Sequence, residues 1–206
     1  VASGHEAAQL AAAVLIESGK DWTFPYYRDV AYCIGLGMTS REHLLGFLAK
    51  ADDPSSGGRQ MPQHYGHKDL RIVSQSSPTG TQFLQAVGCA MARKKENSKE
   101  IVYVSSGEGT TSQGDFHEAL NWASNAKAPV IFHIQDNEYA ISTHKSEQTA
   151  GSVYNMTAGY KNLSRYDVDG TDFFETNLAF RQAVDRARKG KGPSVIISNV
   201  VRLLPH

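Results

Sequence analysis

Two short polar segments contain residue types that could hold a charged ligand. Gly107-Glu108-Gly109 follows a β-branched run at 101–105 and precedes a predicted helix. A glycine-rich loop between a strand and a helix offers free backbone N–H groups, which hold phosphate together with the helix N-terminus. A Walker loop is excluded, because Asp115 follows Gly114 where that motif requires lysine. A dinucleotide-binding fingerprint is excluded because it would need a third glycine at Ser112.

Glu108 places a carboxylate in this predicted phosphate cradle, which is unfavourable unless a cation lies between the two negative groups. Mg²⁺ would remove the conflict, since it binds one or two oxygen side chains together with phosphate oxygens and water. Its other protein ligands would come from Asp136-Asn137-Glu138-Tyr139, which follows the predicted strand at 130–134. The alternative is a tight strand-to-helix turn with a solvated Glu108.

The elements that must position these segments alternate along the second half of the chain. Residues 101–105, 130–134 and 195–201 read as strands because β-branched side chains dominate them. Helices are predicted over 5–18, 39–50 and 81–95, and the second of these is opened by a Thr39–Glu42 capping box. Two further helices are predicted to begin after Ser112 or Asp115 and after Asp172. The segment 52–80 is predicted to be loop. This alternation predicts an α/β fold with a parallel sheet flanked by helices and a ligand site beyond the carboxyl ends of its strands.

Composition limits the class of protein. The chain has 206 residues, 40% of them hydrophobic and 20% charged, which is typical of a globular protein with one large domain, spanning 1–206, or two small ones. Lys and Arg total 21 and Asp and Glu total 21, so the zero net charge argues against a nucleic-acid or anionic-membrane binder. Two cysteines are too few for a disulfide framework. The first residue, Val1, and the last, His206, indicate a fragment of a longer subunit.

The polar segments belong to a wider resemblance. A Gly-Asp-Gly opening and an Asn-Asn close roughly thirty residues later form the thiamine-diphosphate signature, which Gly107 to Asn137 resembles with Glu108 and Asp136 as departures. Essentially the whole chain resembles the alpha subunits of the decarboxylating first component of 2-oxo acid dehydrogenase complexes. The matching stretches are Tyr26-Tyr27-Arg28-Asp29, Gly58-Arg59-Gln60-Met61-Pro62, His64-Tyr65-Gly66, Ser76-Ser77-Pro78, Gly107-Glu108-Gly109, and Asn137 with Tyr139-Ala140-Ile141-Ser142-Thr143. The 59–66 segment is more similar to the branched-chain (2-oxoisovalerate) branch than to the pyruvate branch.

The resemblance implies a thiamine-diphosphate-binding fold and a role for each matching residue. Mg²⁺ would be bound by Glu108, the Asn137 side chain and the Tyr139 carbonyl. The cofactor would be contacted by Tyr27, Arg28, Ser77, Thr79, Gly107, Glu108, Gly109, Thr110, Asn137, Tyr139 and His206, with Ser77 and His206 as the catalytic pair. A monovalent-cation loop, taking K⁺, would comprise Ser76, Pro78, Thr81 and Gln82.

Simpler structural roles remain open for several of these residues. Arg28 could form a surface ion pair with Asp29. The four residues of the cation loop could form a proline-started helix cap, and His206 could be a frayed terminal residue. The other histidines, His5, His43, His117, His133 and His144, are expected to be structural or surface residues. His64 and His67 could approach the site through their loop, although a place outside it is favoured.

The resemblance implies oxidative decarboxylation of a small-molecule 2-oxo acid, with the branched-chain type favoured, and transfer of the acyl group to lipoyl. The expected partners are a beta subunit, separate or fused, and a lipoyl-bearing acyltransferase core, with no nucleic acid and no membrane. Without the beta half, the chain is predicted to bind cofactor poorly and not to turn over. The absence of a visible signal or transit segment favours a bacterial cytoplasmic protein, or a mitochondrial matrix protein in a eukaryote.

Three other functions remain open. Gln135 and Asp136 depart from the family pattern, which favours a non-catalytic or truncated scaffold subunit. A pyruvate- or acetoin-type dehydrogenase alpha subunit is a second alternative. A transketolase-type enzyme is disfavoured by the stretches at 59–66 and 139–143.

Overall fold

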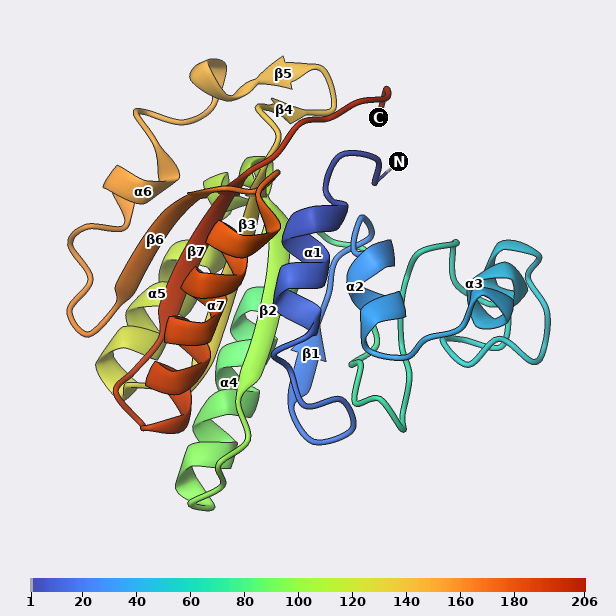
Figure 1. The fold of residues 1–206 in the computed structure, drawn as a ribbon, viewed down its shortest axis with the longest axis horizontal. Helices are drawn as coiled ribbons and strands as arrows, with labels where there is room; N and C mark the ends of the chain where they lie inside the picture. The colour runs from blue at the N-terminus through green and yellow to red at the C-terminus, as the bar shows by residue number, and fades with distance from the viewer. Residues whose placement is uncertain (1) are drawn as a thin grey trace.

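A parallel β-sheet forms the centre of the structure, a computed structural model that describes residues 2–206 (Figure 1). Within these residues the sheet has five strands in the order β1-β2-β3-β7-β6, and every neighbouring pair is parallel. The strands are β1 (Trp22–Phe24), β2 (Val102–Gly107), β3 (Val130–Asp136), β7 (Ser194–Asn199) and β6 (Ser164–Asp169). The predicted α/β class with a parallel sheet is confirmed.

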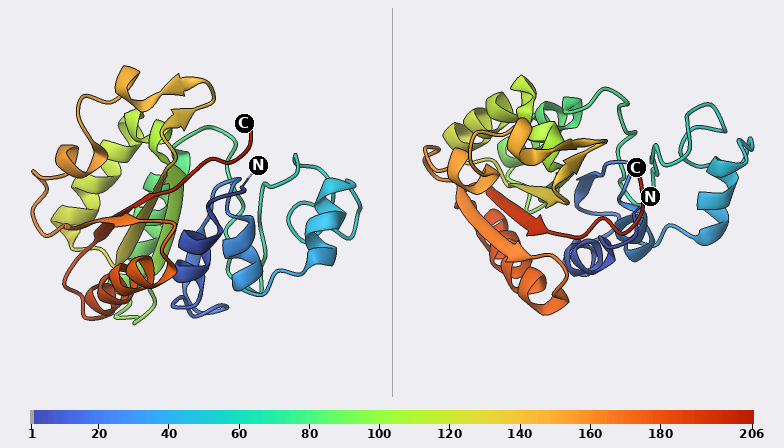
Figure 2. Two further views of the ribbon diagram at one scale, coloured as in Figure 1. Left: turned by 45° about the horizontal axis from the view of Figure 1, so that its top comes forward. Right: turned by 90° about the horizontal axis from the view of Figure 1, so that it is seen from above.

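Helices cover both faces of the sheet (Figures 1 and 2). One face packs against α1 (Glu6–Ala13), α2 (Val30–Gly35) and α7 (Phe173–Arg188), and the other against α4 (Thr81–Lys95), α5 (Gly114–Ala126) and α6 (Val153–Met156). Alternate strand residues point to opposite faces. Tyr103 and Ile131 therefore join the first core, whereas Val104 and Phe132 join the second.

The helices with long apolar faces match the prediction closely. Helix α4 covers the predicted 81–95, and Asp172 caps α7 by accepting from the backbone N–H groups of Phe174 and Glu175. The Thr39–Glu42 capping box is present and opens α3 (Ser40–Phe47). These local signals are sufficient because each helix carries its own apolar stripe or cap.

Three predicted helix boundaries are wrong. The helix predicted over 39–50 ends at Phe47. The helix predicted over 5–18 ends at Ala13, where i→i+3 bonds from the N–H groups of Leu15 and Ile16 tighten the chain into turns. A 3₁₀ segment, η1 (Glu108–Ser112), precedes α5, whose N-cap is Gln113 without a side-chain capping bond. Neither Ser112 nor Asp115 therefore caps this helix.

Some short elements were not predicted. They are β1, β6, α2, α6, the hairpin of β4 (Tyr139–Ala140) and β5 (Thr143–His144), and the 3₁₀ segment η2 (Lys145–Glu147). The predicted loop at 52–80 contains no helix or regular strand, although Ile72 bridges to Thr23 of β1. No helix within residues 2–206 is long and apolar enough to cross a membrane.

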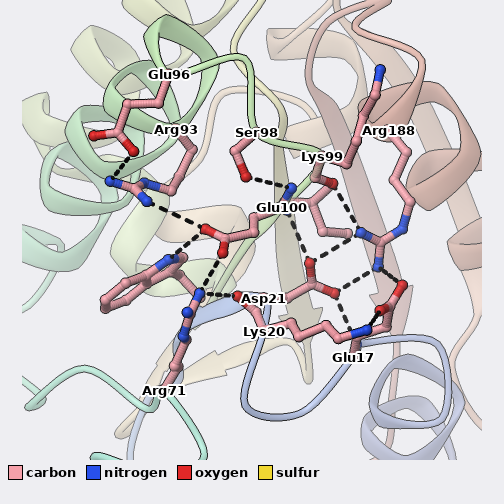
Figure 3. A network of polar contacts seen from close by, with 12 residues as sticks. Glu17, Lys20, Asp21, Arg71, Arg93, Glu96, Ser98, Lys99, Glu100 and Arg188 are labelled. Carbon is pink, nitrogen blue, oxygen red and sulfur yellow. Dashed lines mark hydrogen bonds and ion pairs between the residues drawn. The ribbon is translucent and has the colours of Figure 1, made fainter.

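The two ends of the sheet differ in chemistry. At the carboxyl ends, Gly107 of β2 pairs with Gln135 of β3, so the two polar segments found in the sequence leave the sheet side by side. The β4–β5 hairpin and both ends of the described chain lie at this edge (Figures 1 and 2). At the amino ends, ion pairs around Asp21 and Glu100 connect the strand starts to the end of α7 (Figure 3).

Candidate functional site

A cavity of about 260 Å³ opens at the carboxyl ends of β2 and β3. One ordered water needs only about 10–15 Å³, so this space admits a ligand of many atoms. Its lining comprises Tyr26, Tyr27, Arg28, Thr79, Gly107, Glu108, Gly109, Thr110, Asn137, Tyr139, Ala140, Ile141 and His206. The fold thus brings to one cavity every residue predicted to contact the cofactor or Mg²⁺ except Ser77.

Glu108 is a buried carboxylate with one open oxygen. Its side chain is not solvated, since the residue is only 2% exposed, so the simple solvated turn is wrong. Its Oε2 accepts from the Asn137 backbone N–H at 3.3 Å, whereas Oε1 is buried without a hydrogen-bond partner among the described residues. Burial and the nearby Asp136 raise the pKa of Glu108, and its backbone hydrogen bonds and Lys145 counteract this. A cation at Oε1 would satisfy both the charge and the open oxygen.

Asn137 lies beside Glu108 and is held on both sides of its carboxamide. Its Oδ1 accepts from the Tyr139 N–H at 3.2 Å, and its Nδ2 lies 3.1 Å from Nε2 of His5. His5 is fully buried, and this burial together with Arg28 lowers its pKa to about 4. The sequence prediction placed His5 outside the site. The signal that could have found it is its place directly before a buried alanine-rich helix, with Gln9 one turn later.

Arg28 supplies positive charge to the cavity, and His206 lies against it. Arg28 is 2% exposed and Asp29 is fully buried, so the surface ion pair considered for them is wrong. Nη2 of Arg28 lies 2.7 Å from Nδ1 of His206, and the guanidinium packs over the Tyr27 ring at 5.0 Å. Because a guanidinium only donates, Nδ1 of His206 accepts and the ring proton lies on Nε2. Partial burial and Arg28 lower the pKa of His206, which favours the neutral ring.

A buried polar network supports the segment that carries Arg28. Asp29 accepts from the Tyr26 N–H at 3.2 Å, from the Ser105 hydroxyl, and from Gln135 Nε2 at 2.7 Å. Burial raises the pKa of Asp29 to about 7. Gln135 Oε1 accepts in turn from Gln9 Nε2 at 2.9 Å. Gln135, a departure from the family pattern, therefore joins strand to helix inside the protein and does not line the cavity.

Asp136, the other departure from the family pattern, has a positively charged partner close by. One carboxylate oxygen accepts from the Glu138 N–H at 2.9 Å, and the other pairs with Nζ of Lys145 at 3.1 Å. Lys145 also reaches the Glu138 carboxylate at 3.3 Å. The extra negative charge thus has a local counter-ion, and Asp136 is not in the cavity lining.

Ser77 lies apart from the other predicted site residues. Its Oγ is 2.7 Å from Nε2 of His64, whose Nδ1 is 3.4 Å from the Pro62 carbonyl. The His64 ring is thereby oriented with Nδ1 as donor and Nε2 as acceptor. The structure therefore joins Ser77 to a histidine that was expected to remain outside the site.

The predicted monovalent-cation loop leads into α4. The helix begins after Gly80, whose φ of 93° is left-handed, so Pro78 does not start it and the proline-started cap is wrong. Gln82 is buried and its Nε2 donates to the Ser105 carbonyl at 3.2 Å. These contacts explain the start of the helix and leave the cation loop as a prediction.

The hairpin closes one side of the cavity at van der Waals distance. A Cβ added to Gly109 would lie 2.5 Å from the Cβ of Ala140, so only glycine fits there. Glu138 and Ile141, on either side of β4, adopt left-handed φ angles of 70° and 57°. Such conformations in non-glycine residues cluster at ligand-binding segments, where surrounding contacts hold them.

Comparison with known proteins shows the family to which the chain belongs. The family model described as dehydrogenase E1 component matches residues 1–206. The chain belongs to the dehydrogenase E1 component family. It is 43% identical over 204 residues to the 2-oxoisovalerate dehydrogenase subunit alpha of Bacillus subtilis (strain 168), covering 98% of this chain and 62% of that protein.

Pyruvate dehydrogenase relatives match less well. The chain is 36% identical over 204 residues to the pyruvate dehydrogenase E1 component subunit alpha of Staphylococcus aureus (strain Mu50), covering 99% of this chain and 52% of that protein. The corresponding Staphylococcus epidermidis subunit gives the same identity and coverage. This E1 chain thus spans between half and two thirds of the length of the curated relatives it matches.

Proposed function

We propose that this E1 chain is the alpha part of a thiamine-diphosphate-dependent 2-oxo acid dehydrogenase that acts on a branched-chain 2-oxo acid. The observation that carries the proposal is the buried Glu108 carboxylate, which has one oxygen without a partner among the described residues and lines the same cavity as Asn137 and Arg28. The higher identity to a 2-oxoisovalerate dehydrogenase alpha subunit favours the branched-chain substrate over pyruvate.

The donor set fits a metal bridged to a diphosphate. Glu108, the Asn137 side chain and the Tyr139 carbonyl would supply oxygen ligands to Mg²⁺, which also takes phosphate oxygens. No group of three His, Cys, Asp or Glu side chains able to hold a metal occurs within residues 2–206, so the metal would depend on the diphosphate. Arg28 can bind phosphate oxygens through its planar fork, with the Gly109 and Thr110 backbone on the other side.

The residues of the chain would then bind and orient the cofactor and provide a proton for the substrate. When bound, thiamine diphosphate supplies the carbanion and electron sink of decarboxylation. His206 accepts from Arg28 at Nδ1 and holds its proton at Nε2, where the proton is available to a substrate oxygen. Tyr139 and Ile141 also line the cavity.

The proposal includes partner chains. Within the cavity lining of the described residues, the carboxylate is Glu108, which is committed to the metal. The acid that protonates the aminopyrimidine would therefore come from a beta subunit, separate or fused. The acyl group would pass to a lipoyl-bearing acyltransferase core. The monovalent-cation loop at 76–82 would take K⁺ beside the cofactor.

The non-catalytic scaffold receives less support from the geometry. Gln135 and Asp136 were the reason to consider it, and both have local structural partners in Asp29 and Lys145. Neither substitution leaves a gap in the cavity or removes a proposed metal ligand. A pyruvate-type enzyme remains the second candidate, because 36% identity extends over nearly the whole chain.

Exchange of Glu108 for glutamine tests the metal role. In the full-length subunit assembled with its beta partner, Glu108→Gln is expected to weaken Mg²⁺–thiamine diphosphate binding by at least about 10–100-fold. Calorimetry measures the affinity, and Glu147→Gln, an exposed carboxylate in η2, is the matched control with unchanged affinity. Equal affinity in Glu108→Gln and wild type would refute the metal role.

Substrate preference is tested with the same assembly and an artificial electron acceptor. Decarboxylation of 2-oxoisovalerate with a higher kcat/KM than pyruvate is expected. The reverse order would favour the pyruvate-type alternative, and cofactor binding without turnover of either acid would favour the scaffold.

A further inference from the structure

Helix α1 presents two buried polar side chains to the end of strand β3. His5, at the N-cap, and Gln9, one turn later, are both fully buried. Gln9 Nε2 donates to Gln135 Oε1 at 2.9 Å, and His5 Nε2 lies 3.1 Å from Asn137 Nδ2. One helical turn rises about 5.4 Å and two strand residues rise about 6.6 Å, so the spacing of His5 and Gln9 along the helix is similar to that of Gln135 and Asn137 along the strand. The helix therefore contacts two carboxamides in register at the edge of the cavity.

The two ends of the Asn137 carboxamide differ in what they can bind. The oxygen accepts hydrogen bonds and can ligate a metal, whereas the NH₂ group only donates. Because Nδ2 is the donor, Nε2 of His5 accepts and the imidazole proton lies on Nδ1. The Tyr139 N–H donates to Oδ1 at 3.2 Å and favours the same orientation. A flipped carboxamide would direct its oxygen at the lone pair of His5 and its NH₂ at the Tyr139 N–H.

We propose that His5 is a positioning residue that fixes the Asn137 carboxamide with its oxygen available to the metal. The inference rests on the proposed function, because it concerns Asn137 as a metal ligand. His5 does not line the cavity and acts on the metal only through Asn137. The contact joins residues 132 positions apart in the chain, so the packing of α1 against β3 sets the metal site.

Removal of the acceptor tests this role. His5→Phe keeps a ring of similar size without an acceptor, and it is expected to weaken Mg²⁺–thiamine diphosphate binding about 10–100-fold, as loss of an outer contact to a metal ligand does. His5→Gln retains an acceptor oxygen and is expected to stay within a few-fold of wild type. Calorimetry of the full-length subunit assembled with its beta partner gives both affinities. His5→Met removes the acceptor with a flexible side chain if the phenylalanine variant does not fold.

A double-mutant cycle separates positioning from a general effect on packing. Asn137→Asp replaces the carboxamide with a carboxylate, which has two oxygens and no NH₂ to orient. His5→Phe is therefore expected to have little effect on affinity in the Asn137→Asp background. An equal loss in both backgrounds, or no loss in the native one, would overturn the inference.

A second buried histidine provides the matched control. His133 is also fully buried, and it contacts Tyr103 and Ser198 in the core but lies outside the cavity lining. His133→Phe is expected to lower the melting temperature and leave cofactor affinity unchanged. A loss of affinity equal to that of His5→Phe would identify a general effect of burial and overturn the inference. Absence of binding by the wild-type assembly would instead refute the proposed function, on which the inference rests.

Discussion

Glu108 and Arg28 are buried charges of opposite sign in the wall of one cavity, and they differ in how the protein satisfies them. Arg28 is bonded to His206 and packs on Tyr27, whereas Glu108 keeps one oxygen open. A buried carboxylate with an open oxygen is costly, and the cost is removed by a bound cation. At the residue scale, the site is therefore expected to gain stability when metal and diphosphate bind together.

Gly109 provides a prediction at this scale. Gly109→Ala places a Cβ 2.5 Å from the Cβ of Ala140, so the β4–β5 hairpin must move away from the glycine-rich loop. We expect a stability loss of about 1–3 kcal/mol and at least a tenfold weaker affinity for thiamine diphosphate. Gly88→Ala, in the interior of α4 with nothing within 4 Å of the added Cβ, is the control and is expected to be neutral or stabilising. Unchanged affinity in Gly109→Ala, measured by calorimetry, would contradict the close approach.

Among the elements, those with their own apolar pattern could be predicted from the sequence. Helices α4 and α7 and strands β2, β3 and β7 carry long apolar faces or runs, and their local signals agree with the fold. The β1 strand has only three residues, and β6 is a polar edge strand. Their conformation depends on pairing with a neighbour, which no local pattern encodes.

The residues of the candidate site also fall into those that the sequence could predict and those that it could not. Residues in contiguous motifs, such as the 107–110 loop, could be identified from spacing and resemblance. His5 and the Asp29–Gln135–Gln9 network could not, because their contacts join segments more than 100 residues apart in the chain. Ser77 was predicted by resemblance, and the structure pairs it with His64 outside the cavity lining.

The network at the amino ends of the strands gives a prediction at the scale of elements (Figure 3). Asp21 is fully buried, accepts from the N–H groups of Glu17 and Ile101, and binds both guanidinium nitrogens of Arg188 at 3.1 and 2.7 Å. Asp21→Ala leaves the two backbone N–H groups without this acceptor and leaves Arg188 with only the Lys99 carbonyl and Glu17, so it is expected to cost about 2–4 kcal/mol. Chemical unfolding measures this loss, and Glu96→Gln, at an exposed ion pair with Arg93, is the control with a change within about 0.5 kcal/mol.

Cofactor affinity is the second measurement for Asp21→Ala. The network lies at the end of the sheet opposite the cavity, so the folded variant is expected to bind Mg²⁺–thiamine diphosphate as the wild type does. A stability loss no larger than that of Glu96→Gln, or a selective loss of affinity, would contradict the separation of the two ends.

At the scale of the whole molecule, burial sets the pH dependence of stability. Burial lowers the pKa of His133 to about 3 and, with Arg28, that of His5 to about 4, from an ordinary value of 6.5. Between pH 4 and 6.5 the unfolded chain therefore binds protons at both histidines that the folded chain does not, and stability falls as the pH falls. Asp29 acts in the opposite direction, because its raised pKa, about 7 instead of 3.8, lets the folded state hold a proton that the unfolded state releases.

Exchange of one histidine isolates its share of this dependence. His133→Gln removes a titrating group and retains a side chain that can bond to Tyr103 and Ser198. Each proton bound only by the unfolded state contributes about 1.4 kcal/mol per pH unit. Between pH 4.5 and 6, the unfolding free energy of the variant is therefore expected to fall with acid by about 1.4 kcal/mol per unit less than that of the wild type. Urea unfolding at each pH measures both slopes, and parallel slopes would show that His133 is protonated in the folded state. Any change in the strength of these core hydrogen bonds shifts the two curves apart by a constant, so the difference in slope reports the proton alone.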